Sequence, residues 1–483
     1  MGGLLLAPCV AKKVCQCSDR HLSREERGAR VVSSVSHSPD NRPTSVSGAT
    51  PPITTSGMLG GMAGRRGVPL VVPLPFLLTG VCAAALFGLL LPWVAPEAVQ
   101  SPDFPHVLAL VHLATLGWLT MTIMGASLQL VPVMIVAPLR ATRFLPWQYP
   151  VYTGGVVLLL SGFWWMRPWL LAAGGVVIVL AVLHYVVVLG ITLVHATTRP
   201  LTLRFLAASL LYLCLVVSLG LTAALNMQFG FLGAGADRLL LIHLTLGVLG
   251  WLSSLLMGVS YTLVRLFALA HGHDDRLGRV IFVLLQGSIV GLALGFLFSW
   301  LALILLGGGV LIATVWLFAY DFWRMFRTRH RKLLDVTQYH SMAAVVSFCL
   351  VVPAGIASVV FGWQQPAVLA ALGLAALVGW LGQSIIGYLY KIVPFLVWHT
   401  RYGPLVGREK VPLMRELVHE RWAWLSWWLI NGGLVGVILS ALLAWSILLQ
   451  ITSGLLGAGL VLAAANIAGV VRHLRKHPSP AHR

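Results

Sequence analysis

The chain has 483 residues, of which 58% are hydrophobic and only 10% are charged, and it carries a formal net charge of +19 at pH 7. A soluble globular protein has about 25% charged residues, so this composition excludes one and predicts an integral membrane protein embedded in the lipid bilayer. The positive charge lies in short loops and tails instead of on a folded polar domain, which excludes a nucleic-acid-binding protein.

The first 61 residues are polar and rich in Ser, Arg, Pro and Thr, with no apolar run long enough for a signal peptide or a span. We expect residues 1–61 to form a disordered leader, with Met58 or Met62 as an alternative start of translation. The three cysteines of this leader lack the paired CxxC spacing of a zinc site, and the other three are scattered through apolar runs. Neither a zinc site nor a disulfide framework is therefore expected.

Apolar runs long enough to cross the hydrocarbon, which requires roughly 20 residues, recur between Val68 and Val471. They predict an all-α membrane protein with about twelve transmembrane helices in residues 62–471, followed by a basic cytoplasmic tail over residues 472–483. The expected spans are 69–94, 106–136, 148–165, 168–194, 203–226, 239–268, 279–298, 300–323, 338–362, 367–397, 422–441 and 446–471.

Lys and Arg are retained on the cytoplasmic side of a membrane, so the charge of the loops predicts the orientation. Every second loop is basic, beginning with Arg140 and Arg143 after the second span, whereas the alternate loops carry little positive charge. The N and C termini are therefore both expected in the cytoplasm, and the membrane is expected to be a prokaryotic cytoplasmic membrane.

Three spans share one pattern, a Gly-Trp-Leu triplet followed by a second Gly eight positions after the first. The copies begin at Gly117, Gly250 and Gly379. Their near-constant separation predicts three four-helix pseudo-repeats. Glycines two turns apart allow close approach of neighbouring helices, so helix packing is the favoured interpretation of the motif and a chemical role of its Trp is not.

The central parts of the spans contain no Asp or Glu, which disfavours a carboxylate-driven pump, but several spans contain histidine. His112 and His243 lie 20 and 22 residues before the inner marks Pro132 and Arg265, so the two imidazoles are expected at nearly the same depth, about 30 and 33 Å from those marks at 1.5 Å per residue. Two histidines on different helices can bind copper or clamp a haem iron. The alternative is that each imidazole only bonds a neighbouring hydroxyl or carbonyl.

The remaining histidines are weaker candidates. His106 lies at the edge of the second span and is expected at the interface, with a ligand role as the lesser alternative. His184 and His340 lie at other depths, so packing is favoured for both. His271 and His273, in the loop AHGHDD, are expected in a solvated polar turn instead of a surface metal site.

The span sequence HLATLGWLTMTIMGASLQLVPV, the twelve spans and the threefold pattern resemble the haem-copper oxidase subunit I superfamily. The resemblance covers residues of about 68 to 471. It implies that His112, or less favourably His106, is an axial haem ligand, and that His243 lies on the helix that supplies a copper ligand.

Other residues of that family's pattern are missing. The resemblance would place a Tyr near His243, but Gly247 stands four positions after it. Leu372 and Leu374 stand where the tenth span of that family would supply ligands. A complete oxygen-reducing centre is therefore not expected, and whether the protein is an enzyme stays open.

Three functional interpretations follow. The first is an oxidase-like protein binding haem or, less favourably, copper, with respiratory or other membrane subunits as partners. The second is a transporter or channel for a small neutral or apolar substrate, suggested by Gln129, Gln383, Tyr388 and Tyr390 in the repeated spans. The third is a structural or assembly partner whose histidines only pack.

Overall fold

The structure is a computed structural model and describes residues 68–270, 273–330 and 333–475. The predicted leader, the end of the predicted tail and His271 lie outside the described residues. Within these ranges the chain is almost entirely helical, and its one β feature is an isolated antiparallel bridge between Ala270 and Arg329.

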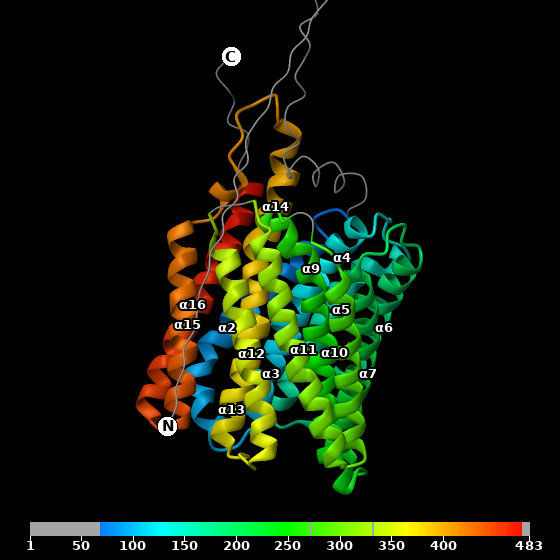
Figure 1. Cartoon of the computed structure of the whole chain (residues 1–483), viewed down its shortest axis with the longest axis vertical. Helices are drawn as coiled ribbons and strands as arrows, with labels where there is room; N and C mark the ends of the chain where they lie inside the picture. Colours follow the sequence, from blue (N-terminus) through cyan, green and yellow to red (C-terminus); the bar gives the residue numbers. More distant parts are fainter. Residues whose placement is uncertain (1–67, 271–272, 331–332, 476–483) are drawn as a thin grey trace, which may run out of the picture. The chain divides into compact units, whose positions relative to one another are not determined.

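The long helices run side by side (Figure 1). Three of them are composite, because a π-helical segment joins two α-helical parts. In chain order the helices are α2 (Pro73–Ala98), the first composite helix α3–η1–α4 (Pro105–His112, Leu113–Thr120, Met121–Met134), α5 (Leu145–Trp164), α6 (Pro168–Val194), α7 (Leu201–Phe229), the second composite helix α8–η4–α9 (Ala236–Leu244, Thr245–Ser253, Ser254–Ala268), α10 (Arg276–Leu297), α11 (Leu301–Arg327), α12 (Val336–Val360), the third composite helix α13–η5–α14 (Pro366–Leu374, Ala375–Gly382, Gln383–Arg401), α15 (Glu420–Leu442) and α16 (Ser446–Gly469). Short 3₁₀ segments are η2 (Thr142–Phe144), η3 (Gly233–Gly235), η6 (Gly403–Leu405), η7 (Met414–Leu417) and η8 (Val470–Leu474).

Local chemistry explains several helix boundaries. Proline, whose fixed φ suits the first turn, begins α2, α3, α6 and α13. A capping box of Asp335 and Gln338 begins α12. Three-residue turns follow α5, α10 and α15, and each contains one residue with positive φ, namely Met166, Ser299 or Ala444.

In the described part of the chain, eleven helices are long and apolar enough to cross a membrane, one fewer than the twelve expected. The missing one is α5, whose first half reads LPWQYPVYTG. It has 20 residues, against 26 in α2 and 27 in α6, and it packs along both ends of its neighbours. Near its start, Tyr149 shares a 2.8 Å hydrogen bond with Thr79 in the first turns of α2, and at its end the Trp164 ring lies 4.6 Å from that of His106, in the first turn of α3.

The outward-facing helix surfaces are apolar, as contact with a lipid bilayer requires. Leu180, Leu306 and Leu350 are each at least 60% exposed on α6, α11 and α12. Most of the exposed tryptophans lie near the ends of the helices, where an aromatic side chain suits the membrane interface. One group contains Trp165, Trp169, Trp300, Trp363 and Trp445, and the other contains Trp147, Trp323, Trp422 and Trp428. These features support a multi-pass membrane protein.

The three Gly-Trp-Leu copies all lie in the π-helical segments η1, η4 and η5. Each segment ends two residues after its Trp, at Thr120, Ser253 and Gly382. π-Helical turns are rare, and they widen the helix locally and change the direction of the side chains beyond them.

The three tryptophans connect the composite helices. Trp251 Nε1 donates to Thr120 Oγ1 at 2.9 Å, and Trp380 Nε1 donates to Ser253 Oγ at 2.9 Å. The corresponding partner of Trp118 would be Gly382, which has no side chain to accept a bond, and the buried Trp118 Nε1 has no hydrogen-bond partner among the described residues. A Cβ on Gly382 would lie 2.5 Å from Trp118 Cη2, so the ring takes the space of a side chain there.

The glycines of the motif have the packing role predicted for them. A Cβ on Gly125 would lie 2.7 Å from Phe76 Cβ in α2, and a Cβ on Gly387 would lie 2.8 Å from His340 Cβ in α12. Gly258 meets Phe205 of α7 in the same way. Only glycine permits so close an approach of each composite helix to its neighbour.

Candidate metal site

His112 is the last residue of α3, directly before η1. Its Nδ1 lies 2.7 Å from the carbonyl oxygen of Leu108. A carbonyl can only accept, so Nδ1 carries the proton and the Nε2 lone pair is free to bind a metal. The ring stacks on Phe163 of α5 with 4.7 Å between the ring centroids.

His243 lies in α8, two residues before η4. Its Nδ1–H donates to the carbonyl of Val216 in α7 at 3.1 Å, which again leaves Nε2 without a proton. The ring rests against Gly220, where a Cβ would lie 3.1 Å from His243 Cε1. Glycine at this position therefore leaves the room that the imidazole uses.

His112 and His243 share two local features. Both precede a π-helical segment by no more than two residues, and both hold Nδ1–H on a backbone carbonyl. Metal-binding histidines almost always fix their second nitrogen in this way, because that bond sets the tautomer and the direction of the ring.

His106 does not join this pair. Its Nδ1 lies 3.1 Å from Glu97 Oε2 at the end of α2, and its ring packs on Trp164. These partners and its half-exposed position agree with the interfacial position expected for it.

No three His, Cys, Asp or Glu side chains converge in a way that could hold a metal ion anywhere in the described ranges. The candidate donor set is therefore the two imidazoles of His112 and His243 alone. Two described cavities lie elsewhere. The larger, about 150 Å³, lies between α2, α3, α13, α15 and α16, and the smaller, about 70 Å³, lies between α4, α7, α9 and α14. Neither histidine lines either cavity.

His184 and His340 share an arrangement that the sequence did not reveal. Each bonds through Nδ1 to the Oε1 atom of a glutamine, which is Gln148 for His184 and Gln383 for His340. The expected packing role suits His184, which is partly exposed on α6.

His340 is fully buried and belongs to a hydrogen-bonded chain across three helices. Gln383 Nε2 donates to Asn431 Oδ1 at 2.6 Å, and Asn431 Nδ2 donates to the carbonyl of Trp427 at 2.7 Å. These bonds fix Gln383 Oε1 as an acceptor, so His340 Nδ1 must be the donor. Its Nε2 is buried without a hydrogen-bond partner, which has a free-energy cost in a membrane interior.

The prediction that His273 lies in a solvated turn is wrong. The side chain of His273 is only 1% exposed, and its Nε2 lies 3.2 Å from Asp321 Oδ1. Tyr261 donates to the other oxygen of this buried carboxylate at 3.1 Å, and Arg324 donates to Oδ1 at 3.3 Å. A buried carboxylate is stable only with such partners, and the spacing of these residues in the sequence does not show that they meet.

Four residues suggested a transport path, and three of them form hydrogen bonds to neighbouring helices. Tyr388 bonds Ser260 at 2.6 Å, Tyr390 bonds Ser426 at 3.2 Å, and Gln383 belongs to the chain described above. These bonds hold the helices together. Gln129 Oε1 is buried with no hydrogen-bond partner.

Comparison with protein-family models finds no match to this chain, and comparison with curated proteins finds none either.

Proposed function

We propose that this membrane protein is a cytochrome oxidase subunit I-like protein that binds a single metal centre through His112 and His243. The observation that carries the proposal is the shared state of the two imidazoles. Each has its Nδ1–H fixed on a backbone carbonyl, and each presents Nε2 as a lone-pair donor. A metal held between them would join the first and second composite helices.

The donor set fits copper better than haem. Two neutral imidazoles are a sufficient ligand set for monovalent copper, which accepts linear two-coordinate geometry, and imidazole is a good copper ligand. A haem would need a wide slot between the rings. His112 is already stacked on Phe163, His243 is packed on Gly220, and neither lines a described cavity. Copper would supply one-electron chemistry, and the two histidines would hold it and set its access.

A complete oxygen-reducing centre is not part of the proposal. Gly247, Leu372 and Leu374 offer no donor atoms where further ligands would be needed. Electron transfer or metal handling therefore fits the residues better than oxygen reduction.

The test measures copper and iron in the purified full-length protein by elemental analysis, together with its visible spectrum. We expect about one copper per chain, no Soret band, and loss of the copper in the double variant His112→Ala/His243→Ala. His184→Ala is the matched control, because His184 also forms a hydrogen bond through Nδ1 but does not belong to the pair. This variant should keep the metal.

Two results would count against the proposal. One is protein without copper or iron after expression in metal-supplemented medium. The other is a double variant that keeps its full metal content. Substrate flux in proteoliposomes that survives the double substitution would instead favour the transporter.

We further propose that the chain consists of three four-helix repeats, α2–α6, α7–α11 and α12–α16, with both termini in the cytoplasm. Matched contacts support it. The first glycines of the three motif copies, Gly117, Gly250 and Gly379, approach Ala83, Tyr212 and Ser347. Each of these lies seven positions after the residue that the second glycine of the same copy approaches, namely Phe76, Phe205 or His340. The three-residue turns also match, because Arg167, Trp300 and Trp445 each donate their backbone N–H to the carbonyl five residues earlier.

A further inference from the structure

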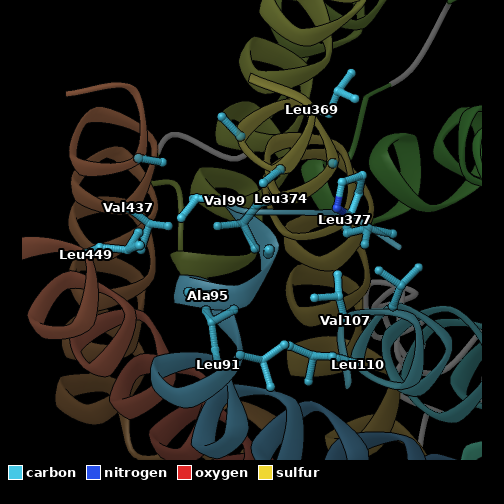
Figure 2. A pocket seen from close by; sticks show the side chains of 18 of the residues that line it. Leu91, Ala95, Val99, Val107, Leu110, Leu369, Leu374, Leu377, Val437 and Leu449 are labelled. Atoms are coloured by element: carbon cyan, nitrogen blue, oxygen red, sulfur yellow. The ribbon is translucent and has the colours of Figure 1, made fainter. Parts of the chain in front are cut away.

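The larger cavity is lined only by carbon-rich side chains. Its walls are Val, Leu, Ala, Phe, Pro and Gly residues of α2, α3, α13, η5, α15 and α16 and of the turn after α2. Figure 2 shows the side chains of Leu91, Leu110 and Leu374 around it. Its volume is about 150 Å³, which is ample for several small atoms and contains no polar side chain that would hold water in place.

In the proposed three-part arrangement, this cavity is the counterpart of the His112–His243 site. Leu374 lies six residues before Trp380, as His112 lies six before Trp118. Leu110 lies eight residues before Trp118, as His243 lies eight before Trp251. The cavity therefore lies where the third repeat meets the first, and the histidine pair lies where the first meets the second.

The remaining walls correspond in the same way. The backbone N–H of Trp445 donates to the carbonyl of Ser440, and Ala441 is the next residue. In the same way, the N–H of Arg167 donates to the carbonyl of Gly162, and Phe163 is the next residue. Phe163 covers His112 with its ring, whereas Ala441 ends at Cβ and lines the cavity. In the same alignment of the proposed repeats, Leu91, which lines the cavity, corresponds to Gly220, against which His243 packs. The missing ring at position 441 explains why this interface contains open space.

We propose that this cavity binds one small apolar molecule, of a size between a dissolved diatomic gas and benzene, taken up from the bilayer. Apolar cavities of about 150 Å³ stay dry and accept xenon or benzene, because no polar partner compensates a water molecule for its lost hydrogen bonds. Apolar gases concentrate in hydrocarbon, and the cavity lies among membrane-crossing helices. The proposal does not require a metal at the histidine pair.

The probe is xenon. Crystals of the full-length protein pressurised with xenon should show an anomalous peak among Leu91, Leu110 and Leu374. The variant Ala441→Phe supplies the ring that Phe163 supplies at the other interface and should abolish the peak. Val435→Phe is the matched control, because Val435 lies on the same helix but is 56% exposed to lipid, and it should keep the peak.

Ala441→Phe should fold with an apparent Tm at least as high as that of the wild type and with unchanged metal content, which separates this test from the test of the metal site. If Ala441→Phe does not fold, Ala95→Leu fills the same cavity from α2 and should also abolish the peak. Absence of the xenon peak in the wild type, its survival in a folded cavity-filling variant, or continuous acyl-chain density in the cavity would each overturn the proposal.

Discussion

Gly382 shows how one absent side chain decides the position of a large one. The Trp118 ring occupies the space beside its Cα, and an added Cβ would lie 2.5 Å from Cη2. Gly382→Ala should therefore force the ring or the helix to shift, at a cost of about 1–3 kcal/mol. The measurement is the apparent Tm of the purified protein. Gly309→Ala is the control, because nothing lies within 4 Å of that position, and it should leave Tm unchanged or slightly higher.

His340 packs against Gly387 as Phe76 packs against Gly125 and Phe205 against Gly258, so it is a polar residue in a contact that is otherwise aromatic. His340→Phe alone should destabilise the protein by about 1–3 kcal/mol, because it leaves the buried Gln383 Oε1 without a donor. The double variant His340→Phe/Gln383→Met removes that orphaned acceptor and should recover part of the loss. A double variant no more stable than His340→Phe would contradict this account, and thermal unfolding of both decides it.

At the scale of the elements, the tryptophans that connect the composite helices should contribute unequally to the stability of the fold, because not every indole N–H donates a hydrogen bond. Trp251→Phe removes a bond to Thr120 and should cost about 1 kcal/mol beyond the loss of ring volume. Trp118→Phe removes only a buried N–H that has no hydrogen-bond partner. Trp251→Phe should therefore lower the apparent Tm more than Trp118→Phe does. Equal losses would show that the bond contributes nothing measurable.

The helices were predicted from the sequence to within several residues, because apolar runs of membrane length are a strong signal. Their π-helical segments were not, since Gly-Trp-Leu suits an ordinary packing helix equally well. α5 was expected as a span, yet Gln148, Tyr149 and two prolines lower the hydropathy of its first half. Its place follows from contacts with Thr79 and His106, which are distant in sequence.

The candidate site was predictable in part. Matched depth predicts His112 and His243 as a pair, but the tautomer of each depends on the carbonyl of Leu108 or Val216, which only the folded chain positions. The burial of His273 against Asp321 was missed, because the two residues are 48 positions apart and the loop reads as polar.

At the scale of the whole molecule, the proposed topology places Gln100 and the α5–α6 turn on one side of the membrane and Arg408 on the other. Single cysteines at Gln100, Arg167 and Arg408, in a background lacking the six native cysteines, test it with an impermeant maleimide on intact cells. Gln100→Cys and Arg167→Cys should label from outside, and Arg408→Cys only after the membrane is opened. Labelling of Arg167→Cys only from inside would mean that α5 does not cross.

The π-helical segments also bear on the origin of the chain. A π-helical segment closes its hydrogen bonds from residue i to residue i+5, so each bonded turn contains one residue more than a turn of α-helix. Here it occurs in η1, η4 and η5, and each time it ends two residues after the Trp. If the proposed repeats arose by duplication, one such segment in the ancestral four-helix unit, copied twice, accounts for all three. The histidine pair would then be a feature that one junction acquired after the copies had begun to diverge.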